Sequence, residues 1–379
     1  MAARTNPFHY GTPAEGAYFT GRQEELDALV SRMSDGINVV LVSPRRYGKT
    51  SLHRAATARL AAERPPGAVI EVNLLRAGSL PRLAGLLTAG AYRIPGSRWS
   101  RARQAVPEFV RRMRITPVVT FGADGTPRFG FNADLSPQDA ELVLADVYQL
   151  LADEAVSRPA ALILDEFQAV TRIDPDLPDT LKGLADDHPG VSLVLAGSKQ
   201  HLMAELVLEQ QAPLWGMAQR LALGPIAEPE MRRYLMARAT GAGKPLDEPT
   251  AAEIIARAGP VPNDIQHLAY DAFEAAGTIV DHDAVDRGMA AAVGHDSMLF
   301  AEQFAGLSPG QARVLTAIAV EPPVAPYSAD FARRVGLANA SSVRKALLPL
   351  LANETILDRD GGLRVADPFL AEWLRADPH

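Results

Sequence analysis

The chain has 379 residues, of which 47% are hydrophobic and 22% charged, with a formal net charge of −7 at pH 7 and no cysteine. This length predicts two or three domains of an ordinary globular protein, and the lack of cysteine excludes disulfides, thiolate zinc sites and a cysteine nucleophile. The mildly acidic balance gives no overall attraction for nucleic acid or an anionic membrane, so such a contact would need a local basic patch.

The first residues do not resemble a targeting signal. Met1–Tyr10 contains one arginine and no apolar core, unlike a secretory signal, and no apolar run in the chain approaches the roughly 20 residues of a membrane span. We therefore expect a cytoplasmic protein without a membrane partner. Apolar residues at helical spacing then predict a helix over Glu24–Met33.

Short runs that are apolar almost without interruption predict the buried strands of a parallel sheet. The segments between them are long enough for helical crossovers, so the fold class is predicted to be α/β. The four predicted strands are Ile37–Val42, Ala68–Leu74, Ala161–Leu164 and Val191–Ala196, and Arg220–Leu223 is a candidate fifth.

A hairpin insertion is predicted between the second and third strands. Residues Ile115–Ala133 alternate apolar and polar residues on both sides of Asp124-Gly125. This dipeptide between alternating runs is a strong signal for a tight β-hairpin. A helix is expected after it, at Asp139–Ala155.

After Pro225 the pattern becomes helical and predicts a small helical lid followed by a winged helix-turn-helix. The expected domains are residues 1–226, with the hairpin at about 115–133, then 227–298 and 299–379. The predicted lid helices are Glu228–Ala237, Glu248–Ala258, Asp264–Ala276 and Asp281–Ala292. The predicted winged-helix elements are helices Gln311–Val320, Phe331–Val335 and Ala340–Leu351 and strands Ile356–Asp358 and Leu363–Val365.

The segment from Ser43 to Thr50 carries a phosphate-loop motif between a buried strand and a helix. It matches G-x-x-x-x-G-K-[ST] except that Ser43 replaces the first glycine. Main-chain amides and the helix N-terminus would cradle phosphate oxygens, while Lys49 reaches the β- and γ-phosphates and Thr50 ligates Mg²⁺. The bland alternative is a strand–turn–helix with an exposed lysine. The predicted nucleotide-binding residues are Ser43, Pro44, Arg45, Arg46, Tyr47, Gly48, Lys49, Thr50 and Ser51.

Two acids, Asp165 and Glu166, follow the third strand. Ligands of open α/β sheets bind at the carboxyl ends of the strands, which is also the edge of the phosphate loop. Asp165 is therefore predicted to hold Mg²⁺ and Glu166 to orient and deprotonate the attacking water, with Gln168 as a candidate helper. The alternative is that both acids cap the strand and face solvent.

Three further positions are candidates for nucleotide sensing. Ser198 follows the fourth strand and is predicted to contact the γ-phosphate, with an ordinary Gly-Ser turn as the alternative. Arg220 is a candidate arginine finger, although an arginine at a strand start is usually a surface residue. In the lid, Gly259-Pro260-Val261-Pro262 separates two helices, and Pro262 is a candidate contact on the adenine or ribose side.

Together these motifs resemble those of the archaeal/bacterial ATPase family, relatives of AAA+ proteins placed with the STAND signalling ATPases. Residues Pro44–Leu52 look like its phosphate loop, Leu164–Gln168 its acidic motif and Ala196–Ser198 its sensor strand. The resemblance implies a parallel sheet of order 5-1-4-3-2. Asn6-Pro7-Phe8 and Phe19–Leu26 look like its N-terminal box, which implicates Phe19, Gly21 and Arg22 on the adenine side, and Val365–Leu374 looks like its C-terminal ending.

The chain departs from the family pattern at two positions. Ser43 replaces the first loop glycine, and Met217 stands where the family usually has an arginine after Gly216. The second departure puts in doubt an arginine acting from this spot unless Arg220 substitutes. Turnover is therefore expected to be slow or to depend on a partner.

The predicted winged helix has no basic excess. Residues 300–379 contain eight Lys or Arg and nine Asp or Glu, whereas non-specific DNA affinity needs several basic contacts to phosphates. The start of its third helix nevertheless carries polar and basic residues where recognition helices reach bases. Ser342, Arg344, Lys345 and, on the wing, Arg359 are the candidate DNA contacts, and a protein-contact or autoinhibitory module is the alternative.

The leading hypothesis is an ATP-hydrolysing molecular switch that uses ATP or ADP with Mg²⁺ and couples nucleotide state to the winged helix. Its partner would be an unidentified protein or a second copy of the chain. The rival is an ATP-modulated DNA-binding regulator with little turnover. A small-molecule phosphotransferase is the third hypothesis and ranks last, because the predicted lid and winged helix leave no evident acceptor site.

Overall fold

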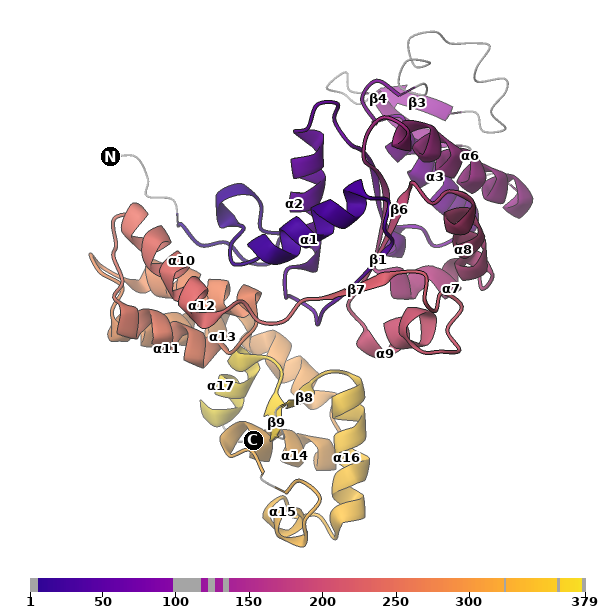
Figure 1. Ribbon diagram of the computed structural model, residues 1–379. Helices are drawn as coiled ribbons and strands as arrows, with labels where there is room; N and C mark the ends of the chain where they lie inside the picture. The colour runs from indigo at the N-terminus through magenta and orange to yellow at the C-terminus, as the bar shows by residue number, and fades with distance from the viewer. Residues whose placement is uncertain are drawn as a thin grey trace. The chain divides into compact units, whose positions relative to one another are not determined.

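The computed structural model describes residues 6–97, 117–121, 127–131, 136–323, 325–359 and 362–376. The chain forms two compact units, Pro13–Pro225 and a second one made of Met1–Thr12 with Ile226–His379 (Figure 1). The first unit contains the phosphate-loop motif and both acids. The second contains the lid and the winged helix.

A five-stranded parallel sheet forms the centre of the first unit. Its order is β2-β5-β6-β1-β7, which confirms the predicted order when the five strands are numbered along the chain and read from the opposite edge. All four predicted strands and the candidate fifth are present close to their predicted bounds. They are β1 (Val39–Val42), β2 (Ala68–Asn73), β5 (Ala160–Asp165), β6 (Ser192–Gly197) and β7 (Gln219–Ala222).

Helices cover both faces of this sheet, and this explains its continuously apolar strands. In β5, Ala161 and Ile163 pack on the side of α1 and α2, whereas Leu162 and Leu164 pack on the opposite side. Figure 1 shows α1 (Gln23–Ser34) and α2 (Lys49–Ala61) on the first face. The opposite face is covered by α3 (Leu80–Ala91), α6 (Pro137–Ala155) and α8 (Leu177–Asp187).

The predicted hairpin insertion is confirmed. Strands β3 (Pro117–Phe121) and β4 (Pro127–Phe131) pair antiparallel, and α6 follows, starting where the Ser136 side chain caps the amide of Asp139. The expected turn at Asp124-Gly125 lies outside the described residues. Shorter elements of this unit are the helical turns Gly16–Tyr18, Leu74–Arg76 and Phe167–Ala169, helices α7 (Val170–Ile173) and α9 (Gln200–Met203), and a π-helical segment Ala204–Leu208.

The second unit begins with the helical lid, and the N-terminal segment packs into it. Phe8 is buried in the lid core, where its ring lies edge-on to that of Phe273. Asp247 and Asp281 cap the second and fourth lid helices through their carboxylates, which fixes where these helices begin. The lid helices are α10 (Glu228–Gly241), α11 (Glu248–Ala258), α12 (Pro262–Ala275) and α13 (His282–Ala305).

The winged helix continues from α13, which runs past its predicted end at Ala292 and past the expected boundary at residue 298. Lid and winged helix share one continuous hydrophobic core, while the three-domain division stays a prediction. A last helix, α17, was not predicted. The elements are α14 (Pro309–Val320), α15 (Ala329–Arg334), α16 (Ala340–Ala352), the antiparallel pair β8 (Ile356–Arg359) and β9 (Gly362–Val365), and α17 (Pro368–Ala376). Among the helices described, none combines the length and apolar character needed to cross a membrane.

Candidate functional site

The phosphate loop joins the end of β1 to the start of α2. Two of its residues have left-handed backbone conformations, Arg46 with φ 66° and Gly48 with φ 89°. Ser43, which replaces the usual first glycine, does not, so a serine carries no backbone penalty there. Ser43, Tyr47 and Lys49 are buried, whereas Arg45 and Arg46 are exposed. The missing glycine therefore imposes no left-handed backbone strain at Ser43.

Lys49 and Thr50 at the start of α2 both reach Asp165 at the end of β5. The Lys49 Nζ atom lies 3.1 Å from Oδ1 of Asp165, and the Thr50 hydroxyl donates to Oδ2 at 3.2 Å. Lys49 and Asp165 are almost fully buried, so the pair is little screened by solvent. The structure thus joins the motif lysine, its threonine and the first acid in one site.

Glu166 reaches the same site by a different backbone route. Neighbouring side chains on a strand point to opposite faces, so an extended Glu166 would point away from the face that Asp165 shares with α2. Glu166 instead has φ 55° and ψ 44°, and its Oε1 lies 3.5 Å from Lys49 Nζ. A left-handed glutamate is strained by about 1–3 kcal/mol, a feature that clusters at functional sites.

Gln168 and Ser198 hold the other oxygen of the Glu166 carboxylate. The Ser198 hydroxyl donates to Oε2 at 3.2 Å, and the Gln168 amide also donates to Oε2. Gln168 is buried, and its Oε1 has no hydrogen-bond partner among the described residues. A buried, unsatisfied acceptor beside a held carboxylate is a suitable place for a water molecule.

Gly197 allows the fourth strand to approach this cluster closely. A Cβ atom there would lie 2.9 Å from Gln168 Oε1 and would also collide with Met203. A larger residue at this position would therefore displace the Gln168 amide or the helix that carries Met203. The glycine before Ser198 is a packing requirement of the site.

His53 is a residue of this site that the sequence analysis missed. Its side chain is fully buried on α2, with Nε2 3.5 Å from Oδ2 of Asp165 and Nδ1 3.5 Å from Oε2 of Glu71. Burial by itself lowers the pKa of the imidazole, but the two carboxylates outweigh it and the pKa ends above its ordinary value. No motif includes His53. The only signal that could have identified it is its spacing of three residues from Thr50, which places both side chains on one face of a helix.

Burial and neighbouring groups also act in opposite directions on Asp165. Burial raises the pKa of this carboxyl, but the His53 imidazole, 3.5 Å away, and the charge of Lys49 together hold it well below its usual range. Asp165 is therefore ionised at neutral pH. Its ionised carboxylate and the Thr50 hydroxyl are hard oxygen donors, the ligand class that Mg²⁺ prefers, so this donor set fits the metal.

The predicted adenine-side residues lie in the same unit. The Arg22 guanidinium is buried and donates to the main-chain oxygens of Tyr47 and Gly224 and to Glu25. It therefore supports the phosphate loop from outside. Phe19 packs against the core under α1 and α2, and Gly21 has a left-handed φ of 63°. Contact of Phe19, Gly21 and Arg22 with nucleotide stays a prediction.

Of two further predicted site residues, Arg220 is exposed and Ser51 is buried. Arg220 lies on the edge strand β7, opposite Val40, and is exposed. None of the hydrogen bonds and ion pairs found among the described residues joins Arg220 to Lys49, Asp165 or Glu166. Ser51 is buried and accepts a hydrogen bond from the amide of Ala14. Neither arrangement tests the predicted roles.

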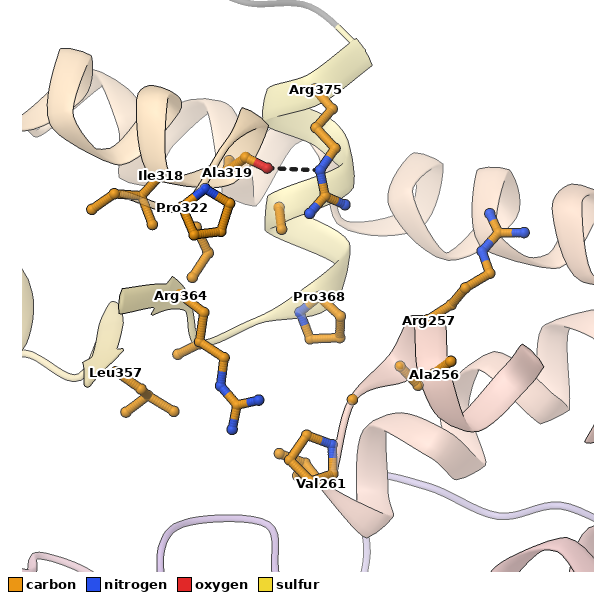
Figure 2. A pocket seen from close by; sticks show the side chains of 16 residues that line it. Ala256, Arg257, Val261, Ile318, Ala319, Pro322, Leu357, Arg364, Pro368 and Arg375 are labelled. Atoms are coloured by element: carbon orange, nitrogen blue, oxygen red, sulfur yellow. Dashed lines mark hydrogen bonds between the residues drawn. The ribbon is translucent and has the colours of Figure 1, made fainter. Parts of the chain in front are cut away.

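The lid loop lines a separate cavity of about 180 Å³ within the second unit. Gly259, Pro260 and Val261 form one wall, and the winged helix forms the other (Figure 2). Arg364 of β9 extends into this space, whereas Arg257 points away from it and pairs with acids of the lid (Figure 2). Pro262 occupies the first turn of α12 and does not line the cavity, and its predicted nucleotide contact stays a prediction.

The candidate DNA contacts lie on α16 and β8. Asn339 caps α16 through the amide of Ser342, and Arg344 and Lys345 are exposed. Neither basic side chain forms an ion pair with any residue that the structure describes. Arg359 lies on the wing strand β8, and its side chain is outside the described part. Helix α16 therefore presents two uncompensated positive charges.

Comparisons with known proteins agree with this architecture. Residues 298–376 match the family model of a probable winged helix domain, which confirms the predicted winged helix. A Walker-type ATPase of Pyrococcus abyssi has a similar structure, with a TM-score of 0.67 and 18% identity over 97% of this chain and 99% of that one. The chain therefore has the fold of a P-loop ATPase with a C-terminal winged helix. No curated protein matches it in sequence.

Two archaeal proteins share this ATPase fold more distantly. The ORC2 protein of Aeropyrum pernix, in its ADPNP–ADP complexes, gives a TM-score of 0.56 at 16% identity over 98% of this chain and 96% of that one. The ORC1 protein of the same organism, in complex with DNA, gives 0.50 at 17% identity over 96% and 94%. At such identities the likeness establishes the fold of the chain, and the expected STAND-type assignment stays a prediction.

Proposed function

We propose that the chain is an ATP-hydrolysing molecular switch that couples its nucleotide state to the winged helix. The observation that carries the proposal is the cluster of Lys49, Asp165 and Glu166, with Glu166 also held by Ser198 and Gln168. This cluster combines a phosphate-binding cation, an ionised carboxylate for a metal ion and a positioned base. The three functions together are those of nucleotide hydrolysis.

Substrate binding would redistribute the charges of this cluster. Lys49 now neutralises two carboxylates, and a triphosphate in the loop would draw its ammonium group toward the β- and γ-phosphates. Thr50 and Asp165 would hold Mg²⁺, which supplies charge neutralisation at the phosphates when it is bound. The main-chain amides of the loop and the start of α2 would stabilise the remaining negative charge.

Glu166 would then act as the general base. The hydrogen bonds from Ser198 and Gln168 fix one of its oxygens, which leaves Oε1, now paired with Lys49, to accept a proton from water. The unsatisfied Oε1 atom of Gln168 would accept a hydrogen bond from the same water. Because Arg220 lies exposed on an edge strand, we expect slow turnover in the isolated chain.

Replacement of Glu166 by glutamine tests this proposal. The variant keeps the shape of the side chain but cannot take a proton, so we expect nucleotide affinity close to wild type and turnover reduced by about 10²–10⁴-fold. Calorimetry measures the affinity and phosphate release measures the turnover. Equal turnover in the two proteins contradicts the role of Glu166, and lack of ATP or ADP binding by the wild type contradicts the whole proposal.

A DNA-binding regulator is the second candidate, because α16 presents Arg344 and Lys345 without acidic partners in the part of the chain that the structure describes. The structure of the A. pernix ORC1 protein, which has a similar fold, is that of a complex with DNA. DNA affinity at low salt, measured by fluorescence anisotropy with ATP, with ADP and without nucleotide, tests this function. A double variant, Arg344→Ala with Lys345→Ala, should bind DNA more weakly and with a smaller dependence on salt. Lack of binding in all three conditions contradicts it.

A further inference from the structure

His53 occupies a buried position between Asp165 of the candidate site and Glu71 of β2. It lies one turn after Lys49 and three residues after Thr50, so all three side chains share the face of α2 that meets Asp165. Its imidazole is fully buried, and burial of such a polar group is unfavourable unless it interacts with a partner. Its position therefore requires an explanation beyond packing.

Each ring nitrogen of His53 faces one carboxylate. Nε2 lies 3.5 Å from Oδ2 of Asp165, the same oxygen that accepts from Thr50, and Nδ1 lies 3.5 Å from Oε2 of Glu71. Both nitrogens are completely shielded, and neither forms a well-aligned hydrogen bond. A small rotation of the ring or of a carboxylate would complete either bond.

Glu71 connects His53 and Asp165 to the surface. It lies on β2, beside β5, and its other oxygen is 3.8 Å from Nε of Arg54, which itself pairs with Glu15. Glu71 is about one third exposed, while Asp165 is almost fully buried. A row of alternating charges therefore leads from solvent to the oxygen of Asp165 next to Thr50, with His53 in its buried centre.

We propose that His53 is a positioning residue that keeps the Asp165 carboxylate turned toward Thr50 and thereby sets the affinity of the site for Mg²⁺. Groups that bond to a metal ligand from behind fix its orientation, and their loss typically weakens metal affinity by about 10- to 100-fold. His53 does not touch nucleotide phosphates in this role. The inference rests on the proposed function, since it assigns Mg²⁺ to Thr50 and Asp165.

The geometry provides two matched substitutions. In His53→Gln the side-chain amide extends to about the position of Nε2, so it keeps a donor toward Asp165. In His53→Asn the shorter amide lies near the position of Nδ1, so it keeps a donor toward Glu71 only. His53→Leu keeps the bulk of the side chain and removes both donors. The three variants separate bonding to Asp165 from packing.

The experiment measures ATP affinity by calorimetry in EDTA and at increasing Mg²⁺ concentrations. We expect all variants to match the wild type in EDTA, because the phosphate loop and Lys49 are unchanged. The Mg²⁺ concentration that half-restores tight binding should rise by about 10- to 100-fold in His53→Leu and His53→Asn, and by much less in His53→Gln. Thermal unfolding of each variant confirms that it is folded. If His53→Leu does not fold, the Mg²⁺ midpoints of His53→Gln and His53→Asn still test the role of His53.

The outcomes distinguish the inference from the proposed function. Equal Mg²⁺ midpoints in the wild type, His53→Gln and His53→Asn overturn the role of His53 and leave the proposed function standing, even if the variants unfold at different temperatures. A wild type that binds ATP equally with and without Mg²⁺ overturns the metal assignment and the role of His53 together. A wild type that binds no nucleotide at all overturns the proposed function.

Discussion

Lys49 and Asp165 are 116 positions apart in the chain, and their side chains meet at 3.1 Å in a buried ion pair. The helix that starts at Lys49 follows β1, and Asp165 ends β5, two strands away in the sheet. The parallel sheet brings the carboxyl ends of these strands to one edge, which is where ligands of such sheets bind. The ion pair of Lys49 and Asp165 is therefore part of both the buried interior and the candidate site.

Replacement of Lys49 by alanine should therefore affect both binding and stability. Loss of a charged contact to phosphate is expected to weaken ATP binding by about 10- to 100-fold. Without nucleotide, the buried Asp165 would lose its main cation, and breaking a buried pair costs about 3–5 kcal/mol. Calorimetry measures the first effect and chemical denaturation the second.

The stability effect of Lys49→Ala has an internal control. Adding Asp165→Asn removes the uncompensated charge, so the double variant should unfold at a higher denaturant concentration than Lys49→Ala alone. Lys182→Ala, at a lysine of α8 whose ammonium bonds the main chain of Pro213, should change neither property. A double variant no more stable than Lys49→Ala would show that the buried charge is not the cause.

Gly197→Ala tests the packing of the sensor strand against Gln168. The added Cβ would collide with Met203 and come 2.9 Å from Gln168 Oε1, and a displacement of the amide would loosen its hold on Glu166. We expect turnover to fall by about 10- to 100-fold, part of what a positioned general base contributes. ATP affinity in EDTA should stay unchanged, because the phosphate loop is not touched.

Gly183→Ala is the matched control for this substitution. Gly183 lies within α8, and a Cβ there meets no atom within 4 Å. Alanine also favours the helix by about 1 kcal/mol over glycine, so this variant should be as active as the wild type and slightly more stable. Unchanged turnover in Gly197→Ala would mean that the close packing at Gly197 is not required to hold Glu166 in place.

The sequence predicted the sheet and the main residues of the site, because both depend on local patterns. The runs of Val39–Val42 and Ala160–Asp165 are buried on both faces, and uninterrupted apolar strands are typical of that environment. The spacing of Lys49 and Thr50 after a strand is a motif with a physical basis. Local pattern was therefore sufficient for the strands, the hairpin and the placement of Lys49 and Asp165 at one edge of the sheet, whereas the order of the strands was implied by the family resemblance.

Other features depend on contacts that no local pattern encodes. The left-handed backbone of Glu166 is exceptional for a residue with a side chain, and composition gives no sign of it. In the sequence, nothing distinguishes His53 from other histidines. Its role becomes evident only because β2 and β5 bring Glu71 and Asp165 within 3.5 Å of its ring. Likewise, α17 was missed because its short apolar face is recognisable only against the core of the winged helix.

The pH dependence of lid stability should reveal the ion network around His282. Its ring lies 2.8 Å from Glu253 and 3.5 Å from Asp286, with Asp283 nearby, and Arg257 bridges the first two acids. The hydrogen bond to Glu253, followed by the charges of the two carboxylates, raises the pKa of His282. The charged form is therefore favoured by folding, so its contribution is present below the ordinary pKa of about 6.5 and is lost as pH rises through the folded value.

His282→Ala should accordingly lower the unfolding temperature more at about pH 5.5 than at about pH 8.5, with the difference reduced by salt. His295→Ala is the control, because His295 is exposed on the same helix and has no ion pair among the residues described. Differential scanning calorimetry at the two pH values measures the effect. If His282→Ala lowers the unfolding temperature by the same amount at both pH values, a charged His282 is excluded as the cause.

The N-terminal segment should contribute to the stability of the lid despite its distance along the chain. Phe8 is 3% exposed in the lid core, and Arg238 donates two hydrogen bonds to the main-chain oxygen of Pro7. Phe8→Ala would leave a cavity beside Phe273 and should reduce the free energy of unfolding by about 3–5 kcal/mol, as measured by denaturation. Tyr327→Ala removes an aromatic ring that is 49% exposed and should cost much less. Similar losses in the two variants would show that residues 6–12 do not pack into the lid core in solution.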